Sequence, residues 1–341
     1  MVYRGEDEVT PVDNKIDKIW EDTFVFLLTF KDQFYSQDIE QNSDINIAEV
    51  IITNEDRKQF IENISQNENF PKFEKFVALI NSTKFYKILF NIVKDNQAVS
   101  MIDNFMKIGD LAEFYYGKIS SLTDFNQIIN CLKSNSSVLN DLKTYFYEGG
   151  FLSKVDVKQN YLENKDFLTN YRELMQGKLC PYCSEGMSVV ELDHFLPKGQ
   201  YPLLSIYSKN LVPSCVECNK EKKEKIELPI SHPFKFNHLD HIKFTFQGDT
   251  AIAVPDVDEE DKKILIQNML KTTNFNRLFK GQIIASDLRK IDYHISKYIN
   301  DSQKISDFVE FQITSKVKKK LYKDYVQNYS ESAMLRDYSN F

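Results

Sequence analysis

Apolar residues recur every three or four positions through much of the first half of the chain, and this is the spacing of one buried face of an α-helix. The spacing is clearest at Ile16, Ile19, Trp20, Phe24 and Leu27, at Phe73, Phe76, Val77 and Ile80, and at Phe85, Ile88, Leu89 and Ile92. Segments rich in Asn and Ser separate these runs, as expected of breaks between helices. The pattern predicts an N-terminal helical domain over residues 1–175.

The pattern changes at Gly177, beyond which prolines and glycines that end helices become frequent. We therefore predict a small irregular module over residues 176–235. Helical spacing returns in residues 236–341, which are expected to be α-rich. Within them the sequence predicts an amphipathic helix near residues 288–298, and a strand pair at residues 242–246 and 251–254 with Gly248 in its turn. The expected fold class is mainly α with a small central module, and α+β overall.

Charge is unevenly distributed along the chain. The net charge is −7, and residues 1–150 carry −9 whereas residues 151–341 carry +2. Because an acidic surface repels phosphates, the N-terminal domain is expected to regulate the protein or bind a protein partner rather than DNA. No charged-then-apolar leader is evident and the apolar runs are too short to span a bilayer, so a cytoplasmic protein without membrane contact is expected.

Four of the five cysteines form two C-x-x-C pairs, Cys180-Pro-Tyr-Cys183 and Cys215-Val-Glu-Cys218, with 31 residues between them. Each pair can direct two thiolates at one ion, and the intervening length is normal for a four-cysteine zinc site. Metal ligation is favoured over disulfides in a chain without a secretory signal. Four thiolates complete a tetrahedral zinc, so this zinc is predicted to be structural rather than catalytic.

Between the two cysteine pairs lies the strand-like run Val189-Val-Glu-Leu-Asp-His-Phe-Leu-Pro-Lys198, which contains an adjacent Asp-His pair. Asn210 then precedes the apolar segment Leu-Val-Pro-Ser, and Asn219 follows the last cysteine where a charged helix begins. In this order of residues the segment resembles the HNH, or ββα-metal, endonucleases. The match covers roughly residues 179–225, under a fifth of the chain, and it implies that the central module is an HNH module.

The resemblance implies a role for each matching residue. His194 would be the general base that activates the attacking water, Asp193 and Asn219 would bind the catalytic metal, and Asn210 would brace the loop that aims the histidine. Phosphodiester cleavage independently requires such groups, because it needs a base near neutral pKa and a hard cation held by oxygen ligands. Asn219 stands where several family members have a histidine, and an oxygen ligand favours Mg²⁺ with Mn²⁺ tolerated. Asn219 could instead cap the helix.

Lysines around these residues are candidates for phosphate contacts. Lys198 closely follows the Asp-His pair, and Lys222 and Lys223 lie on the charged helix that begins at Asn219. Glu221 and Glu224 alternate with the lysines of that helix, so a solvated charged face is an equal alternative. Near the C-terminus, five lysines between residues 316 and 323 are interleaved with Tyr322, a pattern that suits either a nucleic-acid strand or a solubilising helix face.

These features lead to two functional hypotheses. The first is a metal-dependent HNH endonuclease that cleaves nucleic acid, with DNA favoured over RNA as the substrate. Its Glu-Leu-Asp-His-Phe-Leu-Pro-Lys string resembles HNH modules of bacterial anti-phage defence systems of the Septu type, in which a partner ATPase or sensor restrains the nuclease. The second is a non-catalytic zinc-ribbon binding or assembly subunit, which would have no need for Asp193, His194 and Asn219 to converge on a cation.

Overall fold

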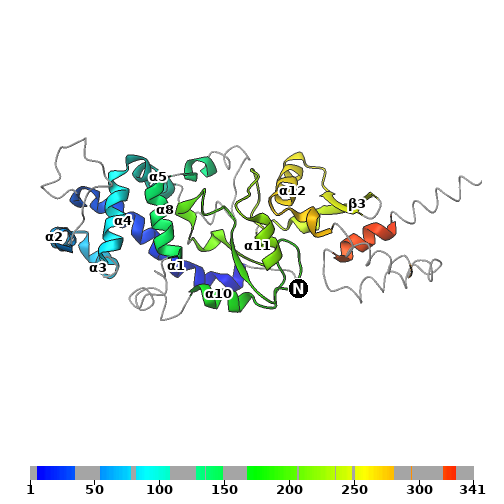
Figure 1. Cartoon of the computed structure of the whole chain (residues 1–341), viewed down its shortest axis with the longest axis horizontal. Helices are drawn as coiled ribbons and strands as arrows, with labels where there is room; N and C mark the ends of the chain where they lie inside the picture. The colour runs from blue at the N-terminus through cyan, green and yellow to red at the C-terminus, as the bar shows by residue number, and fades with distance from the viewer. Residues whose placement is uncertain are drawn as a thin grey trace, which may run out of the picture. The chain divides into compact units, whose positions relative to one another are not determined.

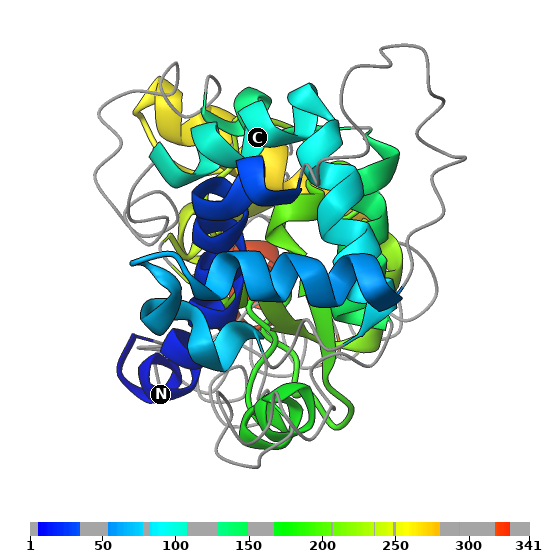
Figure 2. The same ribbon diagram turned by 90° about the vertical axis from the view of Figure 1, so that its left-hand side faces the viewer.

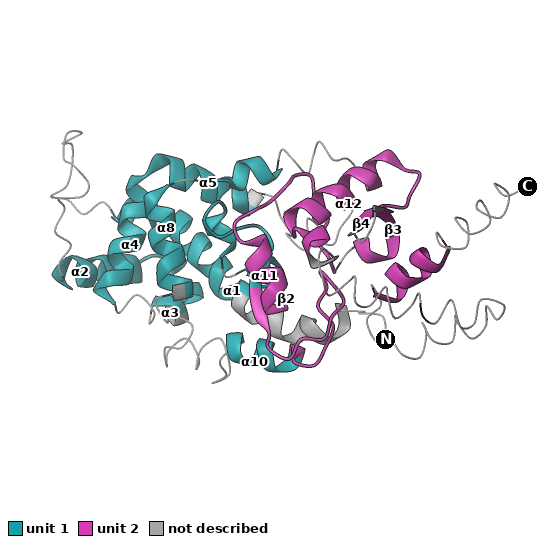
Figure 3. Ribbon diagram, turned by 45° about the vertical axis from the view of Figure 1, so that its right-hand side comes forward, with its two compact units in different colours: residues 1–174, 193–212 teal, residues 175–192, 213–341 magenta. Residues whose placement is uncertain are grey.

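Helices dominate the computed structural model, and two two-stranded sheets lie among the residues that it describes, so the fold is α+β (Figure 1). The structure describes residues 6–34, 54–77, 82–107, 128–134, 136–148, 167–205, 207–234, 236–247, 250–279, 293 and 318–327. Two compact units divide the chain: unit 1 comprises residues 1–174 and 193–212, and unit 2 comprises residues 175–192 and 213–341 (Figure 3). The segment Asp193–Val212, which contains His194, thus clusters with the N-terminal helices.

Helices form the bulk of unit 1. Among the described residues they include α1 (Glu6–Phe30), η1 (Lys31–Phe34), α2 (Asn54–Ser65), α3 (Phe70–Val77), α4 (Thr83–Lys94), α5 (Asn96–Lys107), α8 (Ser137–Lys143), the π-helical turn η4 (Thr144–Glu148) and α10 (Phe167–Met175), whose last residue belongs to unit 2. α1 contacts both α3 and α5, and α4 contacts α5 and α8 (Figure 1 and Figure 2). No helix among the described residues is long and apolar enough to cross a membrane.

The helical periodicity read from the sequence is confirmed by burial. Ile19, Trp20, Phe24 and Leu27 of α1 are at most 2% exposed, and the predicted apolar positions of α4 are likewise buried. Ile80 lies outside the described residues. Local capping sets the start of α5, where the Asp95 carboxylate accepts hydrogen bonds from the main-chain N–H groups of Gln97 and Ala98.

Aromatic rings make up much of the unit 1 core. Phe26 of α1 is surrounded by other phenylalanine rings at centroid distances of 4.9 to 6.4 Å: Phe30, Phe34, Phe60, Phe73 and Phe76. Most of these pairs meet edge to face or tilted, the geometry that aromatic quadrupoles favour. Because the rings come from α1, η1, α2 and α3, this cluster stabilises the helices against one another.

Two short strands and one helix form around the cysteine pairs. β1 (Glu191–His194) pairs with β2 (Leu211–Ser214), and α11 (Val216–Lys222) follows β2. The 3₁₀ turns η6 (Pro202–Leu204) and η7 (Ser208–Asn210) lie between the strands. The expected order of strand, apolar strand and charged helix is therefore present, although the boundary between the two units passes through both strands.

A β-hairpin and a helix follow in unit 2. β3 (Ile242–Gln247) and β4 (Thr250–Pro255) are antiparallel with Phe244 opposite Ala253, so the predicted strand pair is confirmed, while Gly248 lies outside the described residues. α12 (Glu260–Thr272), η8 (His238–His241) and η9 (Phe275–Phe279) complete this region, and residues 318–327 include a further helix. The predicted helix at residues 288–298 lies outside the described residues, apart from Tyr293.

Side chains bind the outer edges of this hairpin. The Asn276 amide accepts from the main-chain N–H of Ala253 at 2.7 Å and donates to its carbonyl, while Asp324 accepts from the main-chain N–H of Phe244 at 2.7 Å. Burial raises the pKa of Asp324, and the Phe244 hydrogen bond partly offsets this effect. The two exposed strand edges are thereby given partners within the chain.

Candidate functional site

The first cysteine pair lies in a tight turn that its own main chain closes. Ser184 N–H donates to the Cys180 carbonyl at 2.7 Å, and Cys180 N–H donates to the Glu185 carbonyl at 2.7 Å. Ser184 and Gly177 have φ of +61° and +77°, and these left-handed residues let the chain reverse on either side of Cys180. The turn presents the thiols of Cys180 and Cys183 on the same side.

The second cysteine pair lies at the junction of β2 and α11. Cys215 is the N-cap of α11, and its sulfur accepts a hydrogen bond from the main-chain N–H of Cys218 at 3.4 Å. Helical geometry brings residues three apart to the same face, so both thiols point to one point in space. Asn219 lies inside α11 rather than at its cap, which removes capping as the reason for an asparagine there.

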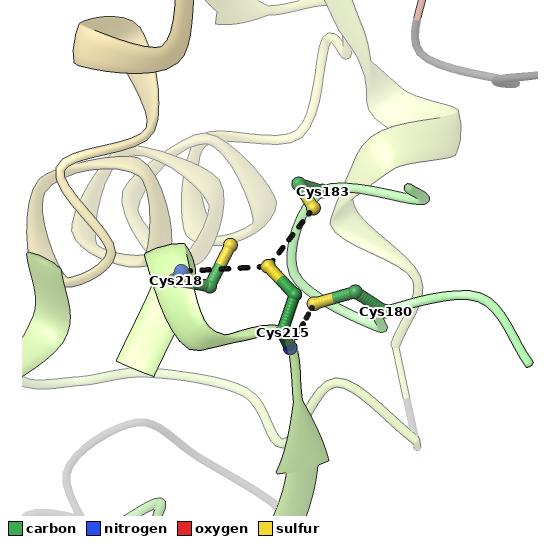
Figure 4. A group of neighbouring side chains, drawn as sticks. All are labelled: Cys180, Cys183, Cys215 and Cys218. Carbon is green, nitrogen blue, oxygen red and sulfur yellow. Dashed lines mark hydrogen bonds between the residues drawn. The ribbon is translucent and has the colours of Figure 1, made fainter. Parts of the chain in front are cut away.

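The four sulfurs meet in one cluster within unit 2 (Figure 4). All four lie within 4.8 Å of one another, and Cys183 Sγ is 3.8 Å from Cys215 Sγ. A tetrahedral zinc with Zn–S bonds of about 2.3 Å requires sulfur separations of roughly 3.8 Å. The cysteines are 1 to 7% exposed, and none forms a disulfide. The donor set and spacing therefore fit a structural zinc site with no open coordination position.

Hydrogen bonding among the four thiols divides their pKa values: it lowers those of Cys180 and Cys215, whereas the bond to Cys180 above all raises those of Cys183 and Cys218. The pKa of the Cys180 thiol lies well below its ordinary value, because Cys183 and then Cys215 and Cys218 donate hydrogen bonds to its thiolate. For Cys215, the interaction with Cys180 raises the pKa, but those with Cys183 and Cys218 outweigh it and lower the pKa to about 7. The main-chain N–H of Cys215 also stabilises the Cys180 thiolate, because it donates to Cys180 Sγ at 3.4 Å. Metal binding requires such thiolates.

His194 ends β1 and is only 8% exposed. Its Nε2 lies 2.8 Å from the main-chain carbonyl oxygen of Ser205. A carbonyl can only accept, so Nε2 carries the proton and Nδ1 of the neutral imidazole is the basic nitrogen. Tyr147 contacts the same ring edge to face, with the centroids 4.7 Å apart. The imidazole is thus held in one orientation with Nδ1 as its proton acceptor.

Asn210 closes the loop that follows His194. Its Oδ1 accepts from Leu196 N–H at 2.8 Å, and its Nδ2 donates to the carbonyls of Leu196 and Leu204, both at 3.0 Å. Its own carbonyl accepts from Phe195 N–H at 2.8 Å. Asn210 is completely buried, so each of these bonds is made without competition from water. Three side-chain bonds and one main-chain bond therefore shape the segment that runs from His194 to Ser205.

Other residues of unit 1 make hydrogen bonds and a ring contact with the segment Asp193–Val212. Asp17 of α1 accepts hydrogen bonds from the main-chain N–H and the hydroxyl of Ser208, at 2.7 and 2.6 Å. Ser134 N–H donates to the Gln200 carbonyl at 2.9 Å. The ammonium of Lys198 lies 4.4 Å from the centroid of the Tyr147 ring. Sequence patterns indicate none of these contacts, because each joins residues far apart in the chain.

The lysines predicted to contact phosphates differ in their exposure to solvent. Lys222 is 0% exposed, so the folded chain covers it, and a phosphate contact there stays a prediction. It lies on the buried side of a helix only seven residues long, where alternating charges gave no sign of which face is covered. Lys223 is exposed. In the C-terminal basic segment, Tyr322 is only 4% exposed and so belongs to the core rather than to a stacking surface.

The predicted site residues fall in both units. Asp193, His194, Lys198 and Asn210 belong to unit 1, whereas Asn219, Lys222, Lys223 and the four cysteines belong to unit 2. Asp193 is 3% exposed. The convergence of Asp193 and Asn219 on one cation stays a prediction.

Part of the chain is similar to two known proteins. It is 36% identical over 84 residues to protein ea31 of Escherichia phage lambda, a match that spans 23% of this chain and 28% of that protein. It is 28% identical over 120 residues to Septu protein PtuB of Bacillus thuringiensis, spanning 31% of this chain and 47% of that protein. The chain therefore covers less than half the length of either relative. No protein-family model matches it, and neither does any solved structure.

Proposed function

We propose that the protein is a metal-dependent HNH endonuclease that acts in anti-phage defence. The observation that carries the proposal is the held imidazole of His194, with Nε2 bound to the Ser205 carbonyl and the following loop closed by Asn210. This arrangement makes Nδ1 the basic nitrogen of a held imidazole, as a general base requires. The sulfur cluster and the partial similarity to a Septu protein add support.

In the proposed reaction, His194 Nδ1 takes a proton from a water molecule, whose oxygen attacks the phosphorus while the bond to the leaving oxygen breaks. The Ser205 carbonyl stabilises the resulting imidazolium through Nε2–H. Asp193 and Asn219 would hold Mg²⁺ or Mn²⁺, which would offset the charge that develops on the phosphate. Lys198 and the exposed Lys223 would contact neighbouring phosphates. The four-cysteine zinc would stabilise the fold without taking part in the reaction.

DNA is the proposed substrate, and cleavage of RNA is the alternative outcome of the same assay. Under the proposal a protein partner, such as an ATPase or a sensor, controls cleavage. The acidic N-terminal part, with its net charge of −9 over residues 1–150, suits contact with a protein better than contact with a polyanion.

The test compares wild-type protein with His194→Ala on plasmid DNA and on RNA, with Mg²⁺ or Mn²⁺ and with a chelator. Loss of a general base is expected to slow cleavage by about 100-fold or more. His241→Ala is the matched control, because His241 lies beside Phe236 in unit 2, away from the segment Asp193–Val212 in the sequence. Equal cleavage by wild type and His194→Ala would contradict the proposal. The zinc-ribbon alternative instead predicts that His194→Ala changes nothing while loss of a cysteine abolishes folding.

A further inference from the structure

Tyr147 stands out among the residues that surround His194, because it belongs to none of the sequence motifs. We propose that Tyr147 is a positioning residue, which aligns the His194 imidazole and the Lys198 ammonium for the reaction; this inference rests on the proposed nuclease function. Tyr147 comes from η4, the π-helical turn directly after α8. π-helical turns are rare and frequently occur at functional sites.

The ring contact complements the hydrogen bond that holds the imidazole. The bond from Nε2 to the Ser205 carbonyl restrains one atom of the ring, but on its own it allows the ring plane to tilt around that atom. Tyr147 meets the imidazole edge to face, with centroids 4.7 Å apart and planes at 68°. This second contact restrains the plane, and it blocks the space into which the imidazole would tilt. Together the two contacts keep Nδ1 in one direction.

Tyr147 is itself anchored by the residues just before it. Tyr145 stacks on Phe85 with centroids 4.8 Å apart and planes at 4°, and Phe146 meets Trp20 at 4.9 Å. Both anchors are at most 4% exposed, whereas Tyr147 is only partly buried. Two consecutive aromatic residues thus fix η4 in the core of unit 1, and the next residue reaches the candidate site from a rigid base.

The same ring contacts Lys198. The Lys198 Nζ lies 4.4 Å from the centroid of the Tyr147 ring, within the range of a cation–π interaction. Lys198 and His194 are four residues apart, with the Pro197 turn between them, so backbone geometry alone does not fix their side chains relative to each other. One aromatic ring in contact with both sets the position of the proposed base relative to the proposed phosphate ligand.

The experiment compares Tyr147→Phe, which keeps the ring, with Tyr147→Ala, which removes it. The tautomer of His194 is measured by nitrogen-15 NMR of histidine-labelled protein without substrate, and His194→Ala identifies the resonances. We expect Tyr147→Phe to keep the Nε2–H tautomer and Tyr147→Ala to give a mixture. In cleavage assays, Tyr147→Ala is expected to lower kcat by about 100-fold, as misplacement of a reacting group does, while Tyr147→Phe stays within about 2-fold of wild type.

The outcomes separate this inference from the proposed function. An unchanged His194 tautomer in Tyr147→Ala would overturn the positioning role, whatever the cleavage rate. Absence of cleavage by wild type, both alone and with its co-purified partner, would contradict the nuclease proposal, while a shifted tautomer would still support the role of Tyr147. Tyr147→Leu replaces Tyr147→Ala if the latter fails to fold. Tyr293→Ala is the matched control, because Tyr293 is 62% exposed and its loss should alter neither reading.

Discussion

Asp17 and Ser208 are joined by two hydrogen bonds although 191 residues separate them in the sequence. The carboxylate of Asp17, on α1, accepts from both the main-chain N–H and the hydroxyl of Ser208, and Ser208 is only 2% exposed. Ser208 precedes Asn210 by two residues, so α1 holds the start of the turn from which Asn210 shapes the His194 loop. Helix α1 therefore directly stabilises the segment that contains His194 and Asn210.

Asp17→Ala tests this support. The change removes a charged acceptor from two short hydrogen bonds, and we expect unit 1 to lose about 2–3 kcal/mol of stability. Trp20 is the sole tryptophan and is buried in unit 1, so urea denaturation followed by its fluorescence reports on this unit. Glu21→Ala is the control on the same helix, because Glu21 is 55% exposed and its ion pair with Lys18 contributes less than about 1 kcal/mol. Equal effects of the two changes would contradict the role of Asp17.

Asn210→Ala should loosen the loop after His194. The change leaves Leu196 N–H and two carbonyls without their buried partner, and an unsatisfied buried group costs about 1–3 kcal/mol. We expect the free energy of unfolding, measured by Trp20 fluorescence, to fall by about 3 kcal/mol. Hydrogen exchange over residues 195–205 should become faster. Asn63→Ala, at an exposed position inside α2, should change stability by less than about 1 kcal/mol. Unaltered exchange in Asn210→Ala would show that the amide does not shape the loop.

Metal analysis tests the cysteine cluster. Purified protein is expected to contain about one zinc per chain, and Cys218→Ser should lose it, because the site needs all four thiolates. The binding of a structural zinc contributes to the free energy of folding, so its removal by a strong chelator should speed hydrogen exchange in the segments around both cysteine pairs. Cys131→Ser is the matched control, since Cys131 is exposed and stands outside the cluster. Full zinc content in Cys218→Ser would rule out the assigned ligand set.

His238 makes the stability of unit 2 depend on pH. Burial lowers its pKa to about 4, and effects of the Tyr182 main chain and Asp240 only partly offset this. The unfolded chain takes up this proton near pH 6.5, so unfolding binds a proton between pH 6.5 and pH 4. Stability therefore falls with acidification across this window, by about 1.4 kcal/mol per pH unit, and is unaffected by this group above it.

Comparison of wild type with His238→Leu isolates that effect. Hydrogen exchange of the β3 and β4 segments, measured from pH 7 to pH 5.5, reports the stability of unit 2. The variant should lose stability less steeply than wild type as pH falls, whereas the same change at the partly exposed His241 provides the control for a lost histidine. Parallel pH profiles for wild type and His238→Leu would refute the assignment to His238.

Local patterns in the sequence determined those features that depend on residues near one another. The three-to-four spacing of apolar residues predicted the helical faces of α1 and α4, because a buried helix face repeats with the helical turn. The paired C-x-x-C spacing predicted a sulfur cluster, since two residues between thiols suffice to aim both at one ion. Alternating apolar residues likewise predicted β3 and β4.

Only the tertiary structure decided which distant residues meet. The contacts of Tyr147 with His194 and of Asp17 with Ser208 depend on how helices pack, and no periodicity or motif encodes that packing. The burial of Lys222 is of the same kind, because a charged helix shows its covered face only once its neighbours are in place. Side-chain chemistry can be read from the residues themselves, but their environment is a property of the folded chain.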